Sequence, residues 1–460
     1  MVLGYTSICS HVHYDIIAHD LIILYIILYY NINMSTRKRL AINGELLEEK
    51  AGWKKIHIYG EPYERGYAHG ILLYKELKKA KDGLVVVARE YCDMSLSDYI
   101  NKSNKTIYPI IKSNYPEFFR ELEGISAGAR RKGVSFSVEY LIAWNSCLSL
   151  YTVDTQQRCS AFIATGDATK TGEIIMAHNT HCEYFMGHHL NIIMKITPST
   201  GIEFTMQTAA GFIASSTDWF MCANGIIGCE TTIGGFEKEP RFGTSAPYFC
   251  RIRQAMQYAN TLDEYCQIMI ENNAGDYACS WLFGDTNTNE ILMLELGLDV
   301  HKISRTNNGL YYGANSAFDL KLRNLETNDN NHDNVEYTSG ARNVRLDYLL
   351  NDKYYGKLDI KIAKRIMACH YDVMLHKENP SSRTVCRHCE LDETCDFKPK
   401  GCTDAKVTDS SMARTMAFHG RFGSGCGRVF KVSQFIKAHP EYKKRAAVMR
   451  DIKKYDWVRL

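Results

Sequence analysis

The chain has 460 residues, of which 45% are hydrophobic and 23% charged, a composition typical of a globular protein with ample material for a core. This length allows one large domain or two to three ordinary ones. Lys and Arg (55) nearly balance Asp and Glu (52), which leaves a net charge of +3, and no basic stripe is interleaved with aromatic residues. The balance argues against a nucleic-acid partner and favours an enzyme with a small-molecule or lipid-like substrate.

Residues 1–33 are unlike the rest and contain a ten-residue apolar run at 21–30 (LIILYIILYY). The run is too short for a confident membrane span but suits the core of a signal peptide, although Asp15, His19 and Asp20 precede it in place of Lys or Arg. Three interpretations stay open: a signal or anchor, a spurious upstream extension, or a buried structural segment. A contact with a membrane surface also stays open.

Sixteen cysteines are spread along the chain, so their pairing cannot be deduced. A secretory compartment with a few disulfides and a reducing compartment with many buried thiols are both consistent with this count. In the first case we expect a secretory, lysosome-like or extracellular location. The glycosylation triplets at 101–103 (NKS) and 104–106 (NKT) matter only in that case.

The folded part is expected to begin at residue 53, with a short strand at 56–60. Residues 61–70 predict a helix that begins near Pro62, and Gly66 and Gly70 on one face of it allow a close approach by a neighbouring element. Segment 53–158 is therefore expected to be mainly helical. Its further predicted helices are 116–131 and 137–150.

From Cys159 onward the pattern changes to short β-rich runs that are flanked by helical ones. This order predicts an α+β layered domain over 159–460, without alternating βαβ units. The predicted strands are 189–196, 202–208, 226–232, 281–285, 290–296 and 311–314. The predicted helices are 247–258, 262–272, 341–350 and 360–370.

The stretch from Arg158 to His181 contains a candidate cysteine nucleophile and a polar cluster that could act with it. Cys159 begins an apolar run at 159–165, a Gly-Asp turn region follows, and a second apolar run at 173–177 ends in the polar residues 178–181 (HNTH). If the two runs pair as a hairpin, a thiol lies beside imidazoles and an amide, as a cysteine nucleophile requires. The alternative is a core hairpin in which Cys159 is a small buried apolar residue.

Several segments together resemble the isopenicillin N acyltransferase-like family and, equally closely, the phospholipase B-like proteins. Three of them are residues 60–70 (GEPYERGYAHG), 122–128 (LEGISAG) and the hairpin that begins at Cys159. Residues 224–232 (NGIIGCETT) and 401–409 (GCTDAKVTD) resemble the phospholipase B-like group. The matches cover most of residues 56–430, and their number and order make the combination fairly specific.

The resemblance implies an N-terminal-nucleophile (Ntn) hydrolase, built as a four-layer αββα sandwich. Such a precursor cleaves itself before the nucleophile, here at Arg158–Cys159, to give associated chains 1–158 and 159–460. The freed α-amino group has an ordinary pKa of about 7.7–8.0 and can accept the thiol proton. The thiolate would attack an amide or ester carbonyl, and water or an amine would resolve the acyl-enzyme. No cofactor is implied.

The same resemblance suggests the rest of the site. Asn315 resembles the oxyanion asparagine, and His178 and Asn179 match the polar cluster after the nucleophile hairpin. Arg342, in residues 339–345 (SGARNVR), is chosen for the cationic contact, with Arg345 as its competitor. The structural alternatives are a core histidine for His178, a strand end with a turn for Asn315 and a structural ion pair for Arg342.

Two other positions bear on these assignments. Acyltransferase relatives carry an aspartate where this chain has His181, a departure that favours the phospholipase B-like branch. Glu230, in the segment that resembles that group, is expected to support the scaffold or line the pocket.

Cys386 and Cys389, with Cys395 and Cys402 downstream, suggest a zinc site. The spacing is loose, so we expect disulfides or free thiols and no metal. His388 falls where relatives carry an Arg-His pair and is expected to line the site.

The leading hypothesis is a self-processing cysteine hydrolase of an amide or acyl ester, including a phospholipase B-like lipid hydrolase. An acyltransferase of the same fold and a catalytically silent binding or structural member are the alternatives.

Overall fold

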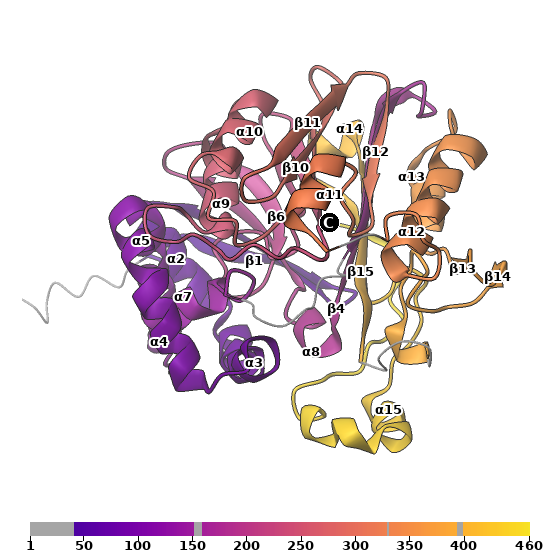
Figure 1. Ribbon diagram of the computed structural model, residues 1–460. Helices are drawn as coiled ribbons and strands as arrows, with labels where there is room; N and C mark the ends of the chain where they lie inside the picture. Colours follow the sequence, from indigo (N-terminus) through magenta and orange to yellow (C-terminus); the bar gives the residue numbers. More distant parts are fainter. Residues whose placement is uncertain (1–40, 151–158, 329–330, 393–398) are drawn as a thin grey trace, which may run out of the picture. The chain divides into compact units, whose positions relative to one another are not determined.

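The computed structural model describes residues 41–150, 159–328, 331–392 and 399–460 (Figure 1). The chain divides into two compact units, Met1–Ile42 and Asn43–Leu460, and the second contains all the elements described below. The predicted apolar segment 1–33, Arg158 and Cys395 lie outside the described residues. Among the helices that the structure describes, none combines the length and apolar content needed to cross a membrane.

The second unit begins with a hairpin of two strands, and helices follow. Helix α6 has the predicted bounds, because Pro116 starts it and an amphipathic pattern continues to Arg131. The elements are β1 (Gly44–Lys50), β2 (Trp53–Gly60), α2 (Pro62–Leu72), α3 (Tyr74–Cys92), α4 (Leu96–Thr106), α5 (Tyr108–Asn114), α6 (Pro116–Arg131) and α7 (Val138–Asn145).

Helices α2 and α6 pack with their backbones in direct contact, as the glycine spacing predicts. A Cβ atom on Gly66 would lie 2.1 Å from the carbonyl oxygen of Glu121, and one on Gly70 would lie 2.2 Å from that of Ile125. Helix α6 has an equally close contact with α2, because a Cβ atom on Gly128 would lie 2.2 Å from the carbonyl oxygen of Tyr67. Only glycine permits this approach, so the two resemblance segments 60–70 and 122–128 meet in space.

The strands form two large sheets. The nine-stranded sheet has the order β1-β2-β5-β6-β7-β8-β9-β10-β11, and the six-stranded sheet has the order β12-β3-β4-β15-β16-β17. Their pairs are antiparallel except β2 with β5. The strands of these two sheets after β2 are β3 (Cys159–Gly166), β4 (Gly172–Glu183), β5 (Ile192–Pro198), β6 (Phe204–Thr208), β7 (Phe220–Cys222), β8 (Ile226–Thr232), β9 (Cys279–Asp285), β10 (Glu290–Leu296), β11 (His301–Thr306), β12 (Gly309–Gly313), β15 (Lys400–Asp409), β16 (His419–Phe422) and β17 (Val458–Arg459). The short strands β13 (Tyr371–Asp372) and β14 (Lys377–Glu378) pair with each other in a separate sheet.

Helices return between and after these strands, close to the predicted ranges. The predicted 341–350 helix begins earlier, at Thr338, and its last residues continue as a π-helical turn (Tyr348–Lys353). The helices are α8 (Tyr184–Gly187), α9 (Tyr248–Tyr258), α10 (Leu262–Ile270), α11 (Leu320–Glu326), α12 (Thr338–Asp347), α13 (Ile360–Met367), α14 (Ser410–Ala413) and α15 (Val432–Ala438).

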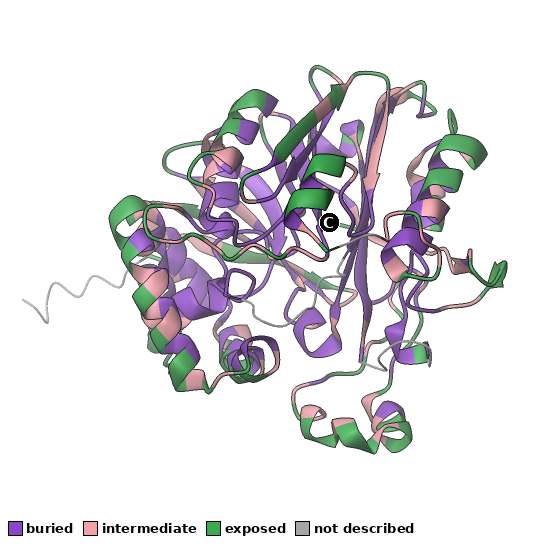
Figure 2. Ribbon diagram, in the orientation of Figure 1, coloured by how far each residue is buried: buried purple, intermediate pink, exposed green. Residues whose placement is uncertain are grey.

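Three apolar cores hold these elements together, and the fold class is α+β. Ile163 and Met176 of the six-stranded sheet pack with Ile227 and Leu282 of the nine-stranded sheet. Phe162, next to Ile163 in β3, points to the opposite face because side chains alternate along a strand, and it joins a core with α12 and α13. Helices α2–α7, α9 and α10 cover the other face of the nine-stranded sheet, and Figure 2 shows the buried strands and the exposed outer faces of the helices.

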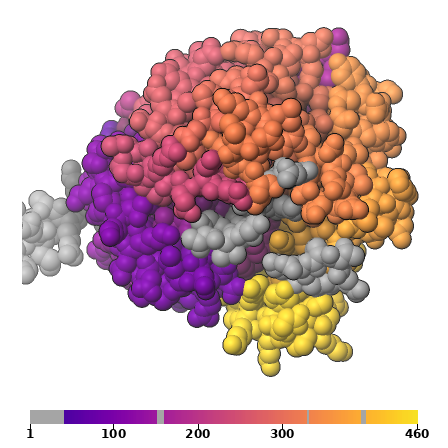
Figure 3. Space-filling model, in the orientation of Figure 1, coloured from indigo at the N-terminus to yellow at the C-terminus, as the bar shows by residue number. Residues whose placement is uncertain are grey.

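The C-terminal residues around α15 lie at one end of the visible face (Figure 3). A small cluster of Tyr184, Phe430 and Phe435 anchors them to the segment after β4. Val432 and Ile436 of this segment also pack against the core between the nine-stranded sheet and its covering helices.

Candidate active site

Cys159 is the first residue of β3, and its side chain is 4% exposed. It lies opposite Thr180 in β4, and Ala161 lies opposite His178. Residues that lie opposite one another in an antiparallel pair share a face of the sheet. The Cys159 thiol, the His178 ring and the Thr180 hydroxyl therefore point to the side on which Ala161 joins the core between the sheets.

Three side chains converge at this point. Cys159 Sγ, one ring nitrogen of His178 and one carboxylate oxygen of Glu230 all lie within 4.8 Å of one another. Glu230 comes from β8 of the nine-stranded sheet, and Tyr277 donates a hydrogen bond of 3.1 Å to its Oε1. The site is therefore assembled from both sheets, with Glu230 lining the cavity beside the thiol. These donor types could also ligate a metal ion.

His178 is a neutral imidazole. Its Nε2 lies 3.1 Å from the carbonyl oxygen of Glu230, which can only accept, so Nε2 carries the proton and Nδ1 the lone pair. Nδ1 is buried and has no hydrogen-bond partner among the described residues. Burial, reinforced by the charge of Lys406, holds the pKa of His178 well below its ordinary value. The ring is therefore a weak base that can orient polar groups at neutral pH.

Arg342 contacts Cys159 from the opposite face of β3. Its Nη1 donates to the Cys159 carbonyl oxygen at 2.7 Å and to Ser160 Oγ at 3.0 Å, and Nη2 donates to Asn315 Oδ1 at 2.9 Å. Burial lowers the pKa of Arg342 to about 9, so it stays charged at neutral pH. Arg345 instead stacks on the Tyr371 ring, 4.3 Å from its centroid. Of the two arginines, the structure therefore brings Arg342 to Cys159.

Asn315 links this arginine to the end of β8. It follows β12 with a φ of 74°, and its Nδ2 donates to the Thr232 carbonyl oxygen at 2.8 Å. An amide nitrogen carries two hydrogens, so a second donor remains on Nδ2. Asn315 is thus linked through Arg342 to the backbone carbonyl of Cys159.

Asn179 lies on the other face of the sheet from the thiol. Its Nδ2 donates to the carbonyl oxygens of Met367 at 2.8 Å and Val385 at 3.0 Å, and it lies opposite Ser160. The side chain therefore holds the segment after α13 against β4, and the structure does not bring it to the Cys159 thiol.

A buried ion pair on the same face of the six-stranded sheet as the thiol was not predicted from the sequence. Lys406 Nζ lies 2.6 Å from Asp404 Oδ1 and donates to Thr180 Oγ1 at 2.7 Å and to Gln207 Oε1 at 2.6 Å. Lys406 lies opposite His178 and Asp404 opposite Thr180, so all four side chains share the thiol's face. The only signal in the sequence was the alternation of charges within residues 401–409.

A cavity of about 30 Å³ opens on the thiol, with room for about one or two water molecules. Its polar lining includes Cys159, Thr180 and Glu230. Its apolar lining comprises Leu148, Met186, Leu190 and Phe212.

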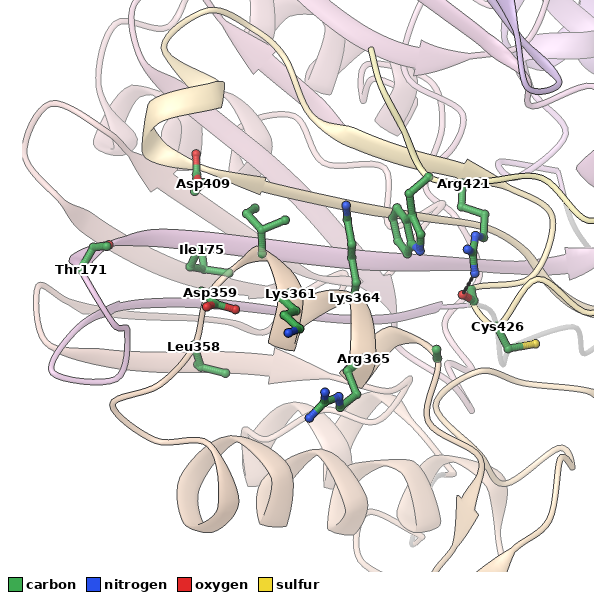
Figure 4. Close-up of a pocket in the computed structure, with 14 residues that line it drawn as sticks. Thr171, Ile175, Leu358, Asp359, Lys361, Lys364, Arg365, Asp409, Arg421 and Cys426 are labelled. Atoms are coloured by element: carbon green, nitrogen blue, oxygen red, sulfur yellow. Dashed lines mark hydrogen bonds between the residues drawn. The ribbon is translucent and has the colours of Figure 1, made fainter.

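A larger cavity, of about 700 Å³, lies along α13 and contains none of the predicted site residues (Figure 4). The smaller cavity is the one that contains the nucleophile candidate, Cys159.

Comparisons with known proteins give distant similarities. No family model matches the chain. An uncharacterized protein of Archaeoglobus fulgidus is 24% identical over 251 residues, which cover 50% of this chain but only 40% of that protein's length. Two solved structures of variants of the conjugated bile acid hydrolase from Clostridium perfringens have TM-scores of 0.35 and 0.36, at 10% and 11% identity. They cover 57% of this chain, and the matches cover 89% and 88% of their own chains.

Proposed function

We propose that this protein is a self-processing cysteine hydrolase of the Ntn type, and that its helical and sheet layers correspond to the αββα sandwich of that class. One observation carries the proposal. Cys159 begins a buried strand, and its thiol faces His178 and Glu230 in a cavity. On the opposite face of the strand, Arg342 fixes its carbonyl group.

Self-processing would use the same thiol. The thiol attacks the Arg158 carbonyl carbon, the C–N bond to Cys159 breaks, and a thioester forms while the nitrogen becomes a free amine. Water then hydrolyses the thioester, which leaves a carboxylate on Arg158 and restores the thiol. The resulting α-amino group belongs to the nucleophile itself, and its ordinary pKa of about 7.7–8.0 makes it a stronger base than His178.

Turnover would repeat this chemistry on an external amide or ester. The α-amine accepts the thiol proton, and the thiolate attacks the substrate carbonyl to form an acyl-enzyme. We assign Asn315 as oxyanion donor through its second Nδ2 hydrogen, and Arg342 as the group that orients Cys159 and Asn315. His178 would position the acyl group or the water.

The apolar residues in the lining of the cavity favour a substrate with an apolar acyl group. Its present size suits a water molecule better than an acyl chain, so substrate binding requires it to widen. The room for water favours hydrolysis over transfer to an amine. We propose phospholipid esters, as in the phospholipase B-like group, and acyl amides as the two substrate classes to assay.

Mapping the chain termini tests the proposal. We expect the purified protein to contain a fragment whose N-terminal sequence is Cys-Ser-Ala-Phe, and intact masses that match a cut before Cys159. Incubation at acidic and neutral pH should increase its yield. A chain that remains uncut under all of these conditions would contradict self-processing and favour the catalytically silent alternative.

The pH profile of a His178→Gln variant separates the two candidate bases. Activity limited by a base rises with pH through the pKa of that base. We expect kcat/KM of wild type and variant to rise with the same midpoint, with the variant about 10-fold slower, because the α-amine rather than His178 accepts the proton. If His178 were the base, the variant would lose the rising limb of the profile altogether.

A further inference from the structure

A second group of chemically reactive side chains lies outside the candidate active site. His370, Cys386, His388 and Cys426 each offer one ligand atom, and these atoms all lie within 4.8 Å of one another. We call them the Cys–His cluster. His370 follows α13, Cys386 and His388 lie in the segment before β15, and Cys426 follows β16. Both cysteines are free thiols.

The distances inside the cluster match a tetrahedral metal site. His388 Nε2 lies 3.5 Å from Cys386 Sγ and 3.5 Å from Cys426 Sγ. A tetrahedral zinc ion with Zn–S bonds of about 2.3 Å and Zn–N bonds of about 2.1 Å separates sulfur from nitrogen ligands by about 3.6 Å. Both measured edges agree with this value, so a zinc ion at the centre would require little movement.

The surroundings also fit a metal centre. Glu390 Oε1 lies 2.9 Å from His388 Nδ1, so Nδ1 carries the proton and Nε2 presents its lone pair to the two sulfurs. A carboxylate behind a histidine is the usual outer partner of a zinc ligand. The backbone N–H of Arg428 donates to Cys426 Sγ at 3.3 Å, a contact that stabilises a thiolate. His370 Nε2 is buried and has no hydrogen-bond partner among the described residues.

We propose that the Cys–His cluster binds one zinc ion in a closed, structural site. Two cysteines and two histidines are a typical zinc ligand set, and four protein ligands leave no open position for catalysis. Uptake of Zn²⁺ would release the two thiol protons, so the metal and two thiolates together carry no net charge. Of the cysteines that the sequence suggested as zinc ligands, Cys386 belongs to the cluster, Cys389 and Cys402 do not, and Cys395 lies outside the described residues. The proposal replaces the expectation of no metal.

The site has a route for the ion. Cys426 lies at one end of the cavity along α13, close to Arg421, as Figure 4 shows. Zinc could therefore reach the cluster from this cavity without disturbing the three main cores.

A zinc ion at this cluster would stabilise the segment that packs behind strands β4 and β15 of the candidate active site. Val385, next to Cys386, accepts the hydrogen bond from Asn179 of β4. Arg387, next to His388, accepts a backbone hydrogen bond of 2.9 Å from Cys402 in β15. The metal would tie this segment to α13 and β16, and thereby stiffen β4 and β15, which carry His178 and Lys406.

The metal content of the full-length protein, purified under reducing conditions after growth with zinc, tests the proposal. We expect one zinc ion per chain, and Co²⁺ replacement should give the visible absorption of a tetrahedral thiolate site. A zinc content below a tenth per chain, or a Cys386–Cys426 disulfide found by peptide mass mapping of this protein, would overturn the proposal.

Variants locate the ion. Cys426→Ser should lose the zinc, and Glu390→Gln should weaken zinc affinity by about 10–100-fold while keeping the four ligands. Cys266→Ala, which removes a buried thiol in the distant α10, should keep one zinc. Retention of full zinc affinity by both Cys426→Ser and Glu390→Gln would refute this location even if the protein binds zinc elsewhere. The cobalt spectrum of the wild-type protein tests metal binding without any variant. The proposal can therefore be tested even if a variant misfolds.

Discussion

Replacement of Cys159 by alanine is expected to abolish both self-cleavage and turnover. The variant should remain a single uncut chain and hydrolyse acyl amides and phospholipids at least about 10⁴-fold more slowly, because the nucleophile is gone. The hydrolysis rate of Cys159→Ser should lie between those of Cys159→Ala and wild type, since a hydroxyl is a weaker nucleophile than a thiol. Intact mass and initial rates on both substrate classes provide the measurement.

Cys266→Ala is the matched control for this experiment. It removes another buried thiol, from α10, which packs on the helix-covered face of the nine-stranded sheet, away from the face that carries the candidate site. We expect it to be cut and to turn over like wild type. Undiminished turnover by Cys159→Ala would remove this cysteine from the mechanism, whereas loss of activity in both variants would indicate a general sensitivity to thiol loss.

Replacement of Lys406 by methionine is expected to have the largest effect on stability. It leaves the fully buried Asp404 carboxylate without its cation, while Gln207 Nε2, at 2.9 Å, remains as a neutral donor. Breaking a buried pair in this way costs about 3–5 kcal/mol of unfolding free energy. Urea denaturation in a Cys159→Ala background, in which the chain stays whole, measures the loss.

The double variant Asp404→Asn/Lys406→Met is the control for this prediction. It removes both charges and should recover part of the stability, because no uncompensated carboxylate remains. A single variant within about 1 kcal/mol of its parent, or a double variant less stable than the single one, would contradict the prediction that an uncompensated Asp404 carboxylate destabilises the fold.

Local patterns explain how much of the fold could be predicted. Helix α6 and strands β8 and β10 have the predicted bounds, because a proline start or a β-rich run between turns marks them. Strand β1 was missed because its sequence, GELLEEK, is mostly charged and its residues are largely exposed. Helix α3 was missed although its buried residues recur at helical spacing, so this signal was available.

The candidate site also has a part that local sequence patterns predict and a part that they do not. The common face of Cys159 and His178 follows from the hairpin, and the same alternation places Asn179 on the opposite face, which the sequence reasoning overlooked. The approach of Glu230 and Lys406 depends on the packing of two sheets and on the register of β15 against β4. No local pattern encodes such a register between segments more than 200 residues apart. The Cys–His cluster likewise depends on contacts among three separate segments.

The parallel pairing of β2 with β5 has a consequence for a chain that is cut before Cys159. These neighbouring strands, joined from Lys54 opposite Ile192 to Gly60 opposite Pro198, would then belong to two different polypeptides within one sheet. Folding as a single precursor is a first-order process, but recovery of the cut protein after denaturation would require two fragments to meet. We therefore expect refolding of the mature form to depend on its concentration, and its lifetime to be governed by the rate of unfolding rather than by a reversible equilibrium.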